Sequence, residues 1–341
     1  MLDDLKYIHE HDHQDALGIA EKSWQQLGYT FNTGQRPVDV ENIVYAGMGG
    51  SALGALISTS WPGYDRPFEI VRNYHPPAYV SDKTFFIASS YSGNTEETLN
   101  AISGAAKKRA SISVIASGGK LAERARDLGY PLALLPSGIQ PRYAVFYGLR
   151  ALLSLLVQAG LLDTSIEKKV IHDASFVQTI AKDFAPTVSS ANNMAKKIAL
   201  ECVGKSVVIY SGPLMYPAAY KWKIGFNENA KQIAWCNQYP EFNHNEMLGW
   251  TKQPLDKPYT VIELVSNLEN PRVQRRFEVA RKLLSGLMPD PIIIKPMGDD
   301  VLQQLLWFIV LGDFVTIYCS LLNGLDPTPV ALIEKFKKSL G

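Results

Sequence analysis

The sequence has 341 residues, of which 46% are hydrophobic and 20% are charged, and its formal net charge is +1. A chain of this length exceeds the usual size of one domain, so we expect two domains of similar size. The near-neutral charge creates no field that would attract nucleic acid or a membrane surface, so neither is expected as a partner.

The cysteines and the first residues indicate a cytoplasmic protein. Cys202, Cys236 and Cys319 lie far apart and form no C-x-x-C motif. This argues against a disulfide framework and a thiolate zinc site, and it fits a reducing compartment. Residues 1–14 are polar and acidic and do not resemble a secretory signal.

Two long apolar stretches, 143–162 and 301–322, are predicted to be buried helices rather than membrane spans. Arg150 interrupts the first stretch, and Gln304 and Asp313 interrupt the second. Charged and amide side chains are rare in the hydrocarbon region of a membrane, where they cost free energy.

A short buried strand is predicted over residues 42–46, and a glycine-rich loop follows it. In residues 47–51, Gly-Met-Gly-Gly-Ser, the glycines let the backbone approach a ligand closely. Ser51 is expected to cap the helix that follows.

The spacing of Gly47, Gly49 and Ala52 also fits the dinucleotide fingerprint G-x-G-x-x-A. A dinucleotide site needs an acidic residue at the end of the second strand, but the predicted second strand, 67–72, ends in Arg72. A small phosphate held by the backbone N–H groups of the loop fits this sequence better.

Residues 85–98 contain a second loop, between the end of a predicted buried strand and the start of a helix. Ser90, Ser92 and Thr95 lie at this junction, where free backbone N–H groups and the positive end of the helix dipole converge. Three small hydroxyl groups add donors without charge, which suits a phosphate monoester. The alternative is an ordinary serine-rich turn with a capping box.

Alternating strands and helices predict an α/β protein with two doubly wound domains, each a parallel sheet flanked by helices. The first domain is expected over residues 1–160 and the second over 161–341. The carboxyl ends of two strands would bring both loops of the first domain together. The corresponding loop of the second domain, 211–213, lacks the double glycine and is expected not to bind phosphate.

Two ionisable residues are candidates for proton transfer. Glu228 and His244 each lie between two asparagines at the boundary of a predicted element. This setting is typical of a positioned catalytic group and also of ordinary capping turns. The sequence contains no metal-ligand spacing and no nucleophile motif, so no metal ion or other cofactor is expected.

These segments together resemble the bifunctional phosphoglucose/phosphomannose isomerases, members of the sugar isomerase (SIS) domain superfamily. The resemblance covers nearly the whole chain, with its motifs in the family's order. The matching motifs are the loop 47–51, S-Y-S-G-N-T at 90–95, P-R at 141–142, F-N-E-N-A-K at 226–231, N-H-N-E at 243–246 and D-P-T-P-V at 326–330.

The resemblance implies the interconversion of glucose 6-phosphate or mannose 6-phosphate with fructose 6-phosphate through an enediol, without a metal ion. Glu228 would move the proton, Arg142 would stabilise the enediolate, and His244 would open the sugar ring. Lys337 would assist, chosen by register over Lys335 and Lys338. The residues implied in binding the phosphate are Gly50, Ser51, Ser90, Ser92 and Thr95. A homodimer is also implied, because the family's histidine reaches the site of the other subunit.

Two other functions remain open. One is a sensor that binds sugar phosphate without catalysis, which would usually carry a basic DNA-binding element that is not evident here. The other is an SIS enzyme acting on amino-sugar phosphates. Those that make glucosamine phosphate usually carry a glutaminase domain, and this chain begins too close to its first strand to hold one.

Overall fold

A computed structural model describes residues 1–252 and 259–340, and these residues form two compact units. The amino-terminal unit comprises Ser23–Phe176, and the carboxy-terminal unit comprises Met1–Lys22 with Val177–Gly341. This division differs from the expected domains, 1–160 and 161–341, because the first 22 residues belong to the carboxy-terminal unit. The physical reason is burial: α1 (Leu5–His11) and α2 (Ala16–Glu21) place apolar side chains in that unit, and the Tyr7 hydroxyl donates to the Leu321 carbonyl (2.7 Å).

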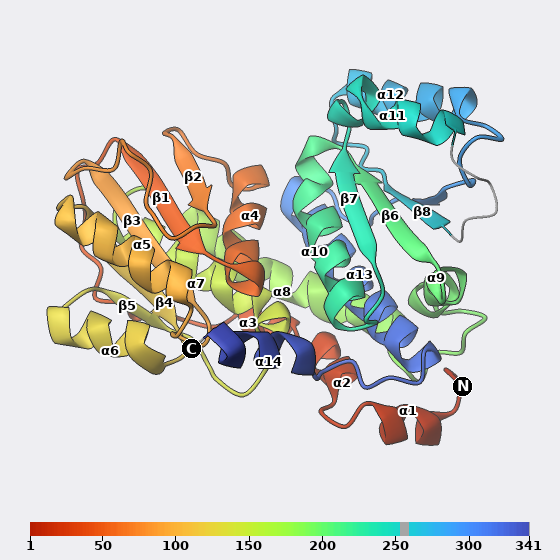
Figure 1. Ribbon diagram of the computed structural model, residues 1–341, viewed down its shortest axis with the longest axis horizontal. Coiled ribbons are helices and arrows are strands. Elements are labelled where there is room, and N and C mark those ends of the chain that lie inside the picture. The colour runs from red at the N-terminus through yellow and green to blue at the C-terminus, as the bar shows by residue number, and fades with distance from the viewer. Residues whose placement is uncertain (253–258, 341) are drawn as a thin grey trace. The chain divides into compact units, whose positions relative to one another are not determined.

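The amino-terminal unit contains a five-stranded parallel sheet with the order β2-β1-β3-β4-β5. Buried residues of α4 and α7 pack against one face of this sheet, and those of α5 and α6 pack against the other (Figure 1). The central strand β3 is buried along its whole length, as its unbroken apolar run predicts. The strands are β1 (Asn42–Gly47), β2 (Phe68–Val71), β3 (Thr84–Ser90), β4 (Ser111–Ala116) and β5 (Leu132–Leu134). The helices are α3 (Trp24–Leu27), α4 (Leu53–Ser60), α5 (Glu96–Lys107), α6 (Gly119–Leu128) and α7 (Val145–Gln158), and α8 (Ser165–Asp183) runs on into the other unit.

The carboxy-terminal unit repeats this plan with a four-stranded parallel sheet of order β7-β6-β8-β9. One face packs against α12 and the segment around α11, and α10 packs along β6 and β7 (Figure 1). The α/β fold with two parallel sheets flanked by helices is therefore confirmed. The strands are β6 (Ser206–Ser211), β7 (Ala234–Gln238), β8 (Tyr259–Leu264) and β9 (Ile292–Ile294). Its remaining helices are α9 (Met194–Cys202), α10 (Tyr216–Glu228), α11 (Glu246–Gly249), α12 (Pro271–Leu283), α13 (Val301–Leu322) and α14 (Ala331–Leu340).

The helix α13 is the central helix of the carboxy-terminal unit. It is the one described helix with the length and apolar character of a membrane span, and nearly all of it is buried inside the unit, as expected of a core helix. Gly312 lets the indole of Trp222 on α10 lie directly against the α13 backbone, where its Nε1 donates to the Phe308 carbonyl (2.6 Å). A buried ion pair between Lys221 and Asp313 joins the same two helices.

Candidate active site

The glycine-rich loop follows β1 as a 3₁₀ turn, Gly49–Ala52, that leads into α4. Gly49 has a φ of +50°, a conformation that glycine adopts without strain. A Cβ at Gly50 would lie 2.8 Å from the carbonyl carbon of Pro141, so the absence of a side chain lets these two backbone segments touch. The loop therefore packs directly on the turn that carries Arg142.

Ser51 does not cap α4 as expected, because it lies inside the 3₁₀ turn and Ala52 precedes the helix. Its hydroxyl oxygen instead accepts a hydrogen bond from the backbone N–H of Tyr91 (2.9 Å). This bond joins the glycine-rich loop to the serine-rich loop after β3. The two loops expected to lie together are therefore in direct contact.

The serine-rich loop is organised around the hydroxyl of Ser90, which is buried. Its Oγ lies 2.7 Å from Oγ1 of Thr95 and accepts the backbone N–H of Gly93 (3.1 Å). Thr95 is the N-cap residue of α5, and its hydroxyl is turned to Ser90 rather than to the first turn of the helix. Ser92 Oγ accepts the N–H of Asn94 (3.3 Å), so the loop's own backbone also holds this hydroxyl.

Arg142 lies in a 3₁₀ turn, Pro141–Tyr143, and is only 1% exposed. Its guanidinium lies 4.7 Å from the centre of the Tyr143 ring and donates to Oε1 of Gln140 at 3.5 Å. The contact between Gly50 and this turn keeps the cation beside the glycine-rich loop. Hydroxyl donors, backbone N–H groups and one arginine at the end of a parallel sheet can bind an anionic group.

Glu228 is the last residue of α10 and is half-buried. Both flanking asparagines are anchored: Nδ2 of Asn229 donates to Thr316 Oγ1 on α13 (2.9 Å), and Nδ2 of Asn227 donates to the Gln232 carbonyl (3.0 Å). These bonds hold the backbone on both sides of the carboxylate. Glu228 also lines a cavity of about 800 Å³, large enough for a sugar phosphate.

Lys231, which the sequence analysis did not single out, makes three backbone contacts beside Glu228. Its ammonium donates to the carbonyl oxygens of Asn229 (3.1 Å), Asp326 (2.8 Å) and Pro327 (3.2 Å). It thereby ties the end of α10 to the turn that leads into α14. The signal was its place in the F-N-E-N-A-K motif, but only the tertiary structure shows what the ammonium contacts.

His244 ends a 3₁₀ turn, Glu241–His244, and its side chain is exposed. Its neighbours are held by hydrogen bonds: Arg276 donates to Oδ1 of Asn243 (3.2 Å), and Nδ2 of Asn245 donates to Oε1 of Glu241 (2.6 Å). The turn therefore presents an exposed imidazole on a fixed backbone.

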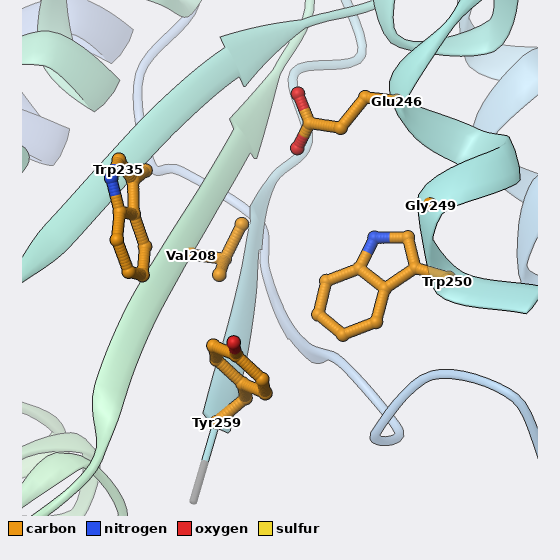
Figure 2. Close-up of a pocket in the computed structure, with 6 residues that line it drawn as sticks. All are labelled: Val208, Trp235, Glu246, Gly249, Trp250 and Tyr259. Carbon is orange, nitrogen blue, oxygen red and sulfur yellow. The ribbon is translucent and has the colours of Figure 1, made fainter. Parts of the chain in front are cut away.

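Glu246 anchors the segment that carries His244 to the sheet. Its carboxylate accepts from the Tyr210 hydroxyl (2.5 Å) on β6 and from Nδ2 of Asn237 (2.6 Å) on β7, and Nε1 of Trp250 donates to the same tyrosine oxygen (3.0 Å). Burial, and then the nearby Glu246 carboxylate, raises the pKa of Tyr210, so it remains a donor. Figure 2 shows Glu246 and Trp250 on one side of a small cavity of about 170 Å³. The strand residues Val208, Trp235 and Tyr259 lie opposite them.

The described residues include no group of three or more histidine, cysteine, aspartate or glutamate side chains that could hold a metal ion. The arrangement around Glu228 is thus one of carboxylate, amide and ammonium groups. These groups can bind polar ligands and transfer protons.

Comparison with known proteins identifies the family. Residues 191–340 match the model described as "Bacterial phospho-glucose isomerase C-terminal SIS domain". The chain is 34% identical over 322 residues to a bifunctional phosphoglucose/phosphomannose isomerase of Caldicellulosiruptor bescii, covering 92% of this chain and 94% of that protein. The chain belongs to the bifunctional phosphoglucose/phosphomannose isomerase family.

The chain is also similar to one further relative and to a solved structure. A D-glucosamine-6-phosphate 4-epimerase of Sulfolobus acidocaldarius is 35% identical over 217 residues, which cover 62% of this chain and 65% of that protein. The crystal structure of a glucose-6-phosphate isomerase like protein from Thermus thermophilus aligns with a TM-score of 0.67. The alignment covers 99% of this chain and 98% of that one at 17% identity, a likeness of fold.

The residues implied by the isomerase resemblance fall into two sets, one in each unit. Glu228, His244 and Lys337 lie within the matched segment 191–340. Lys337 is on α14 and is exposed, as are Lys335 and Lys338, so burial does not distinguish among the three lysines. The loop residues and Arg142 lie in the amino-terminal unit.

Proposed function

We propose that this chain is an aldose–ketose isomerase that interconverts glucose 6-phosphate and mannose 6-phosphate with fructose 6-phosphate. The observation that carries this proposal is the likeness to isomerases of that name along 92% of the chain. The local geometry at both sets of residues supports it. The reaction needs a phosphate anchor, a ring opener, a base and a cation near the developing enediolate.

The phosphate anchor is assigned to the two contacting loops of the amino-terminal unit. Ser90 and Thr95 already share a short hydrogen bond, and Ser51 joins the loops, so their hydroxyls are positioned before a ligand arrives. Gly50 contributes a backbone N–H, and its lack of a side chain lets the loop pack on the Pro141 turn. Ser92 contributes a hydroxyl that its own loop holds in place. Such pre-organisation reduces the entropic cost of binding.

Glu228 is assigned as the base. Its carboxylate removes the proton from C2 of the open-chain aldose, and the electron pair of that C–H bond forms the C1–C2 double bond while the C1 carbonyl oxygen takes the charge. The proton of the C2 hydroxyl moves to the C1 oxygen, which leaves the charge on the C2 oxygen. The same carboxylic acid then returns its proton to C1 as the C2 carbonyl forms, which gives the ketose. Arg142 is assigned to stabilise the enediolate oxygens.

Ring opening is assigned to His244, supplied from the partner subunit of a homodimer. The support is its exposure on a turn whose neighbouring residues are anchored by hydrogen bonds. The helix α14 supports a dimer too, because Leu332, Phe336 and Leu340 expose more than half of their surface. Exposed apolar side chains gathered on one helix mark contact surfaces. A cytoplasmic location is supported by the free thiols of all three cysteines.

A coupled assay for fructose 6-phosphate tests the proposal with glucose 6-phosphate and mannose 6-phosphate as substrates, with and without a chelator. We expect turnover of both, unchanged by the chelator. Glu228→Gln should lower kcat by about 10³-fold or more while sugar-phosphate binding persists. The matched control is Glu123→Gln, at an exposed glutamate on α6. Binding without turnover in the unsubstituted protein would favour a sensor.

A second candidate substrate class is the amino-sugar phosphates. The observation that favours it is the 35% identity to a D-glucosamine-6-phosphate 4-epimerase. Incubation with glucosamine 6-phosphate, followed by separation of the epimers, tests it directly. Formation of a 4-epimer at a rate comparable to fructose 6-phosphate formation would establish this activity.

A further inference from the structure

The two units place corresponding loops at the ends of corresponding strands. In the amino-terminal unit, Gly47 of β1 pairs with Ser89 of β3, and in the carboxy-terminal unit Ser211 of β6 pairs with Leu264 of β8. In both units the residue before the next helix lies six positions after the paired residue of the second strand. Thr95 follows Ser89 in this way before α5, and Asn270 follows Leu264 before α12. The loops therefore correspond position by position.

By this correspondence, Leu214 takes the place of Gly50, because each lies three positions after the paired strand residue (211 + 3 and 47 + 3). Glu269 takes the place of Asn94 in the second loop. The backbone N–H groups of the first loop in the carboxy-terminal unit thus have the position of those assigned to the phosphate in the other unit.

A carboxylate occupies this position in the carboxy-terminal unit. Oε1 of Glu269 accepts the backbone N–H of Leu214 (2.9 Å), and the side chain is 4% exposed. Gly212 has no room for a Cβ, because that atom would overlap the Glu269 carboxylate. The loop is therefore shaped around this side chain.

The geometry points to the Glu269 carboxylate as an internal anion that fills, in the carboxy-terminal unit, the site corresponding to the phosphate site of the amino-terminal unit. This inference rests on the proposed phosphate site in the comparison. The first loop of the carboxy-terminal unit has thus lost the double glycine but kept its anion-binding geometry, and the chain's own carboxylate occupies it.

The charge state of Glu269 agrees with this role above neutral pH. Burial raises its pKa to about 7, and the backbone N–H groups of Leu214 and Met215 oppose that rise. These N–H groups stabilise the charged form, as they would stabilise a bound anion. At pH 8 the loop therefore holds a carboxylate.

The second loop is held in place by contacts that do not involve the Glu269 side chain. Ser266 Oγ donates to Oε1 of Gln304 (2.5 Å), and Nε2 of Gln304 donates to Oδ1 of Asn267 (2.7 Å). Nε2 of Gln274 donates to the Glu269 carbonyl (2.8 Å). Removal of the carboxylate should thus leave the anion position empty while these contacts keep the loops in place.

The experiment counts inorganic phosphate bound per chain by calorimetry at pH 8 and constant ionic strength. Glu269→Ala should bind one more equivalent of phosphate than the unsubstituted chain, and Glu269→Gln, which still fills the space, should not. Adding Ser90→Ala to the Glu269→Ala chain should weaken the original site and leave the new one. Formate, a small carboxylate, should compete at the new site.

A folded Glu269→Ala chain with no added phosphate site would overturn the inference, as would a Glu269→Gln chain that gains the same site. If Glu269→Ala does not fold in chloride, its refolding yield in phosphate or formate decides: recovery supports the inference, and no recovery overturns it. Phosphate counts do not depend on turnover, so failure of the isomerase assay leaves this result interpretable.

Discussion

The two units of this protein share one topology and differ in what fills the loops at the ends of their central strands. In the amino-terminal unit the loops after β1 and β3 carry small hydroxyl residues and glycine. The Ser90 hydroxyl bonds within the loop after β3, and the Ser51 hydroxyl joins the two loops. In the carboxy-terminal unit the same positions enclose the Glu269 carboxylate. One topology can therefore hold hydroxyl groups in the loops of one unit and a buried carboxylate in the loops of the other.

The largest effect is expected from Gly93→Ala in the serine-rich loop. Gly93 has a φ of +72°, and a Cβ there would overlap the backbone oxygen of Gly118. A backbone neighbour cannot move aside cheaply, so we expect a loss of about 3 kcal/mol or more in the free energy of unfolding, measured with urea.

Gly148→Ala and Gly212→Ala are the controls for Gly93→Ala. Gly148→Ala on α7 meets no atom within 4 Å and should leave stability unchanged or slightly raised. Gly212→Ala should cost less than Gly93→Ala, because its neighbour is the end of the Glu269 side chain. Equal losses in the free energy of unfolding for Gly93→Ala and Gly148→Ala would contradict the expected overlap at Gly93.

The second prediction concerns the pH dependence of stability at Glu269. Its pKa is about 7 in the folded chain and 4.5 ordinarily, so the folded state binds more protons between these values. The free energy of unfolding should therefore fall as pH rises through this window, by on the order of 3 kcal/mol from this group.

Glu269→Gln has no such proton to lose. Relative to the unsubstituted chain, it should gain stability as pH rises from about 5 to 8, in urea titrations at several pH values. Glu123→Gln, at an exposed site, serves as control. If the free energy of unfolding changes with pH in the same way for the Glu269→Gln and unsubstituted chains, the buried carboxylate is not the source of the pH dependence.

The third prediction addresses how Glu228 is held. Asn229→Ala removes the hydrogen bond to Thr316 on α13, so the backbone beside the carboxylate loses one of its anchors. We expect kcat to fall about 10- to 100-fold with KM little changed, because misplacement of the proposed base, Glu228, affects the transition state more than binding. Thr316→Val removes the same bond from the other side and should reproduce the effect. Normal kcat in both variants would show that this anchor does not matter.

The smallest expected effect is on KM, when one hydroxyl is removed from either unit. Ser90→Ala should raise KM for sugar phosphate about tenfold, since a hydrogen bond to a charged group contributes about 1.5 kcal/mol or more. Ser211→Ala in the other unit is the matched control. The Ser211 hydroxyl is buried and has no hydrogen-bond partner among the described residues. Its removal should leave KM unchanged, and steady-state kinetics on both variants test the difference.

Much of the fold could be predicted from local patterns. The unbroken apolar run of β3, the glycine-rich loop after β1 and the end of α13 at Asn323 and Gly324 all follow from short-range sequence signals. The first 22 residues lie in a different unit from the one expected, because an amphipathic helix does not specify which surface covers its apolar side.

The site was predicted less completely for the same reason. Ser51 has the residue type of a helix cap, but its hydroxyl accepts from Tyr91, forty positions away. Lys231 and Glu269 were not identified, because a lone lysine or glutamate in a loop is ordinarily solvated. Their partners become apparent only when strands distant in the sequence are brought together.

Short-range signals indicate where strands become helices and which junctions carry small hydroxyl residues, because turn and cap chemistry depend on neighbouring residues. Which loop is held by hydroxyl groups and which encloses a carboxylate became apparent only in the folded units. The contact of Gly50 with Pro141 and that of Glu269 with Leu214 both join segments separated by more than fifty residues. Burial removes the water that would otherwise satisfy these groups, so their partners are set by the packing of the whole unit.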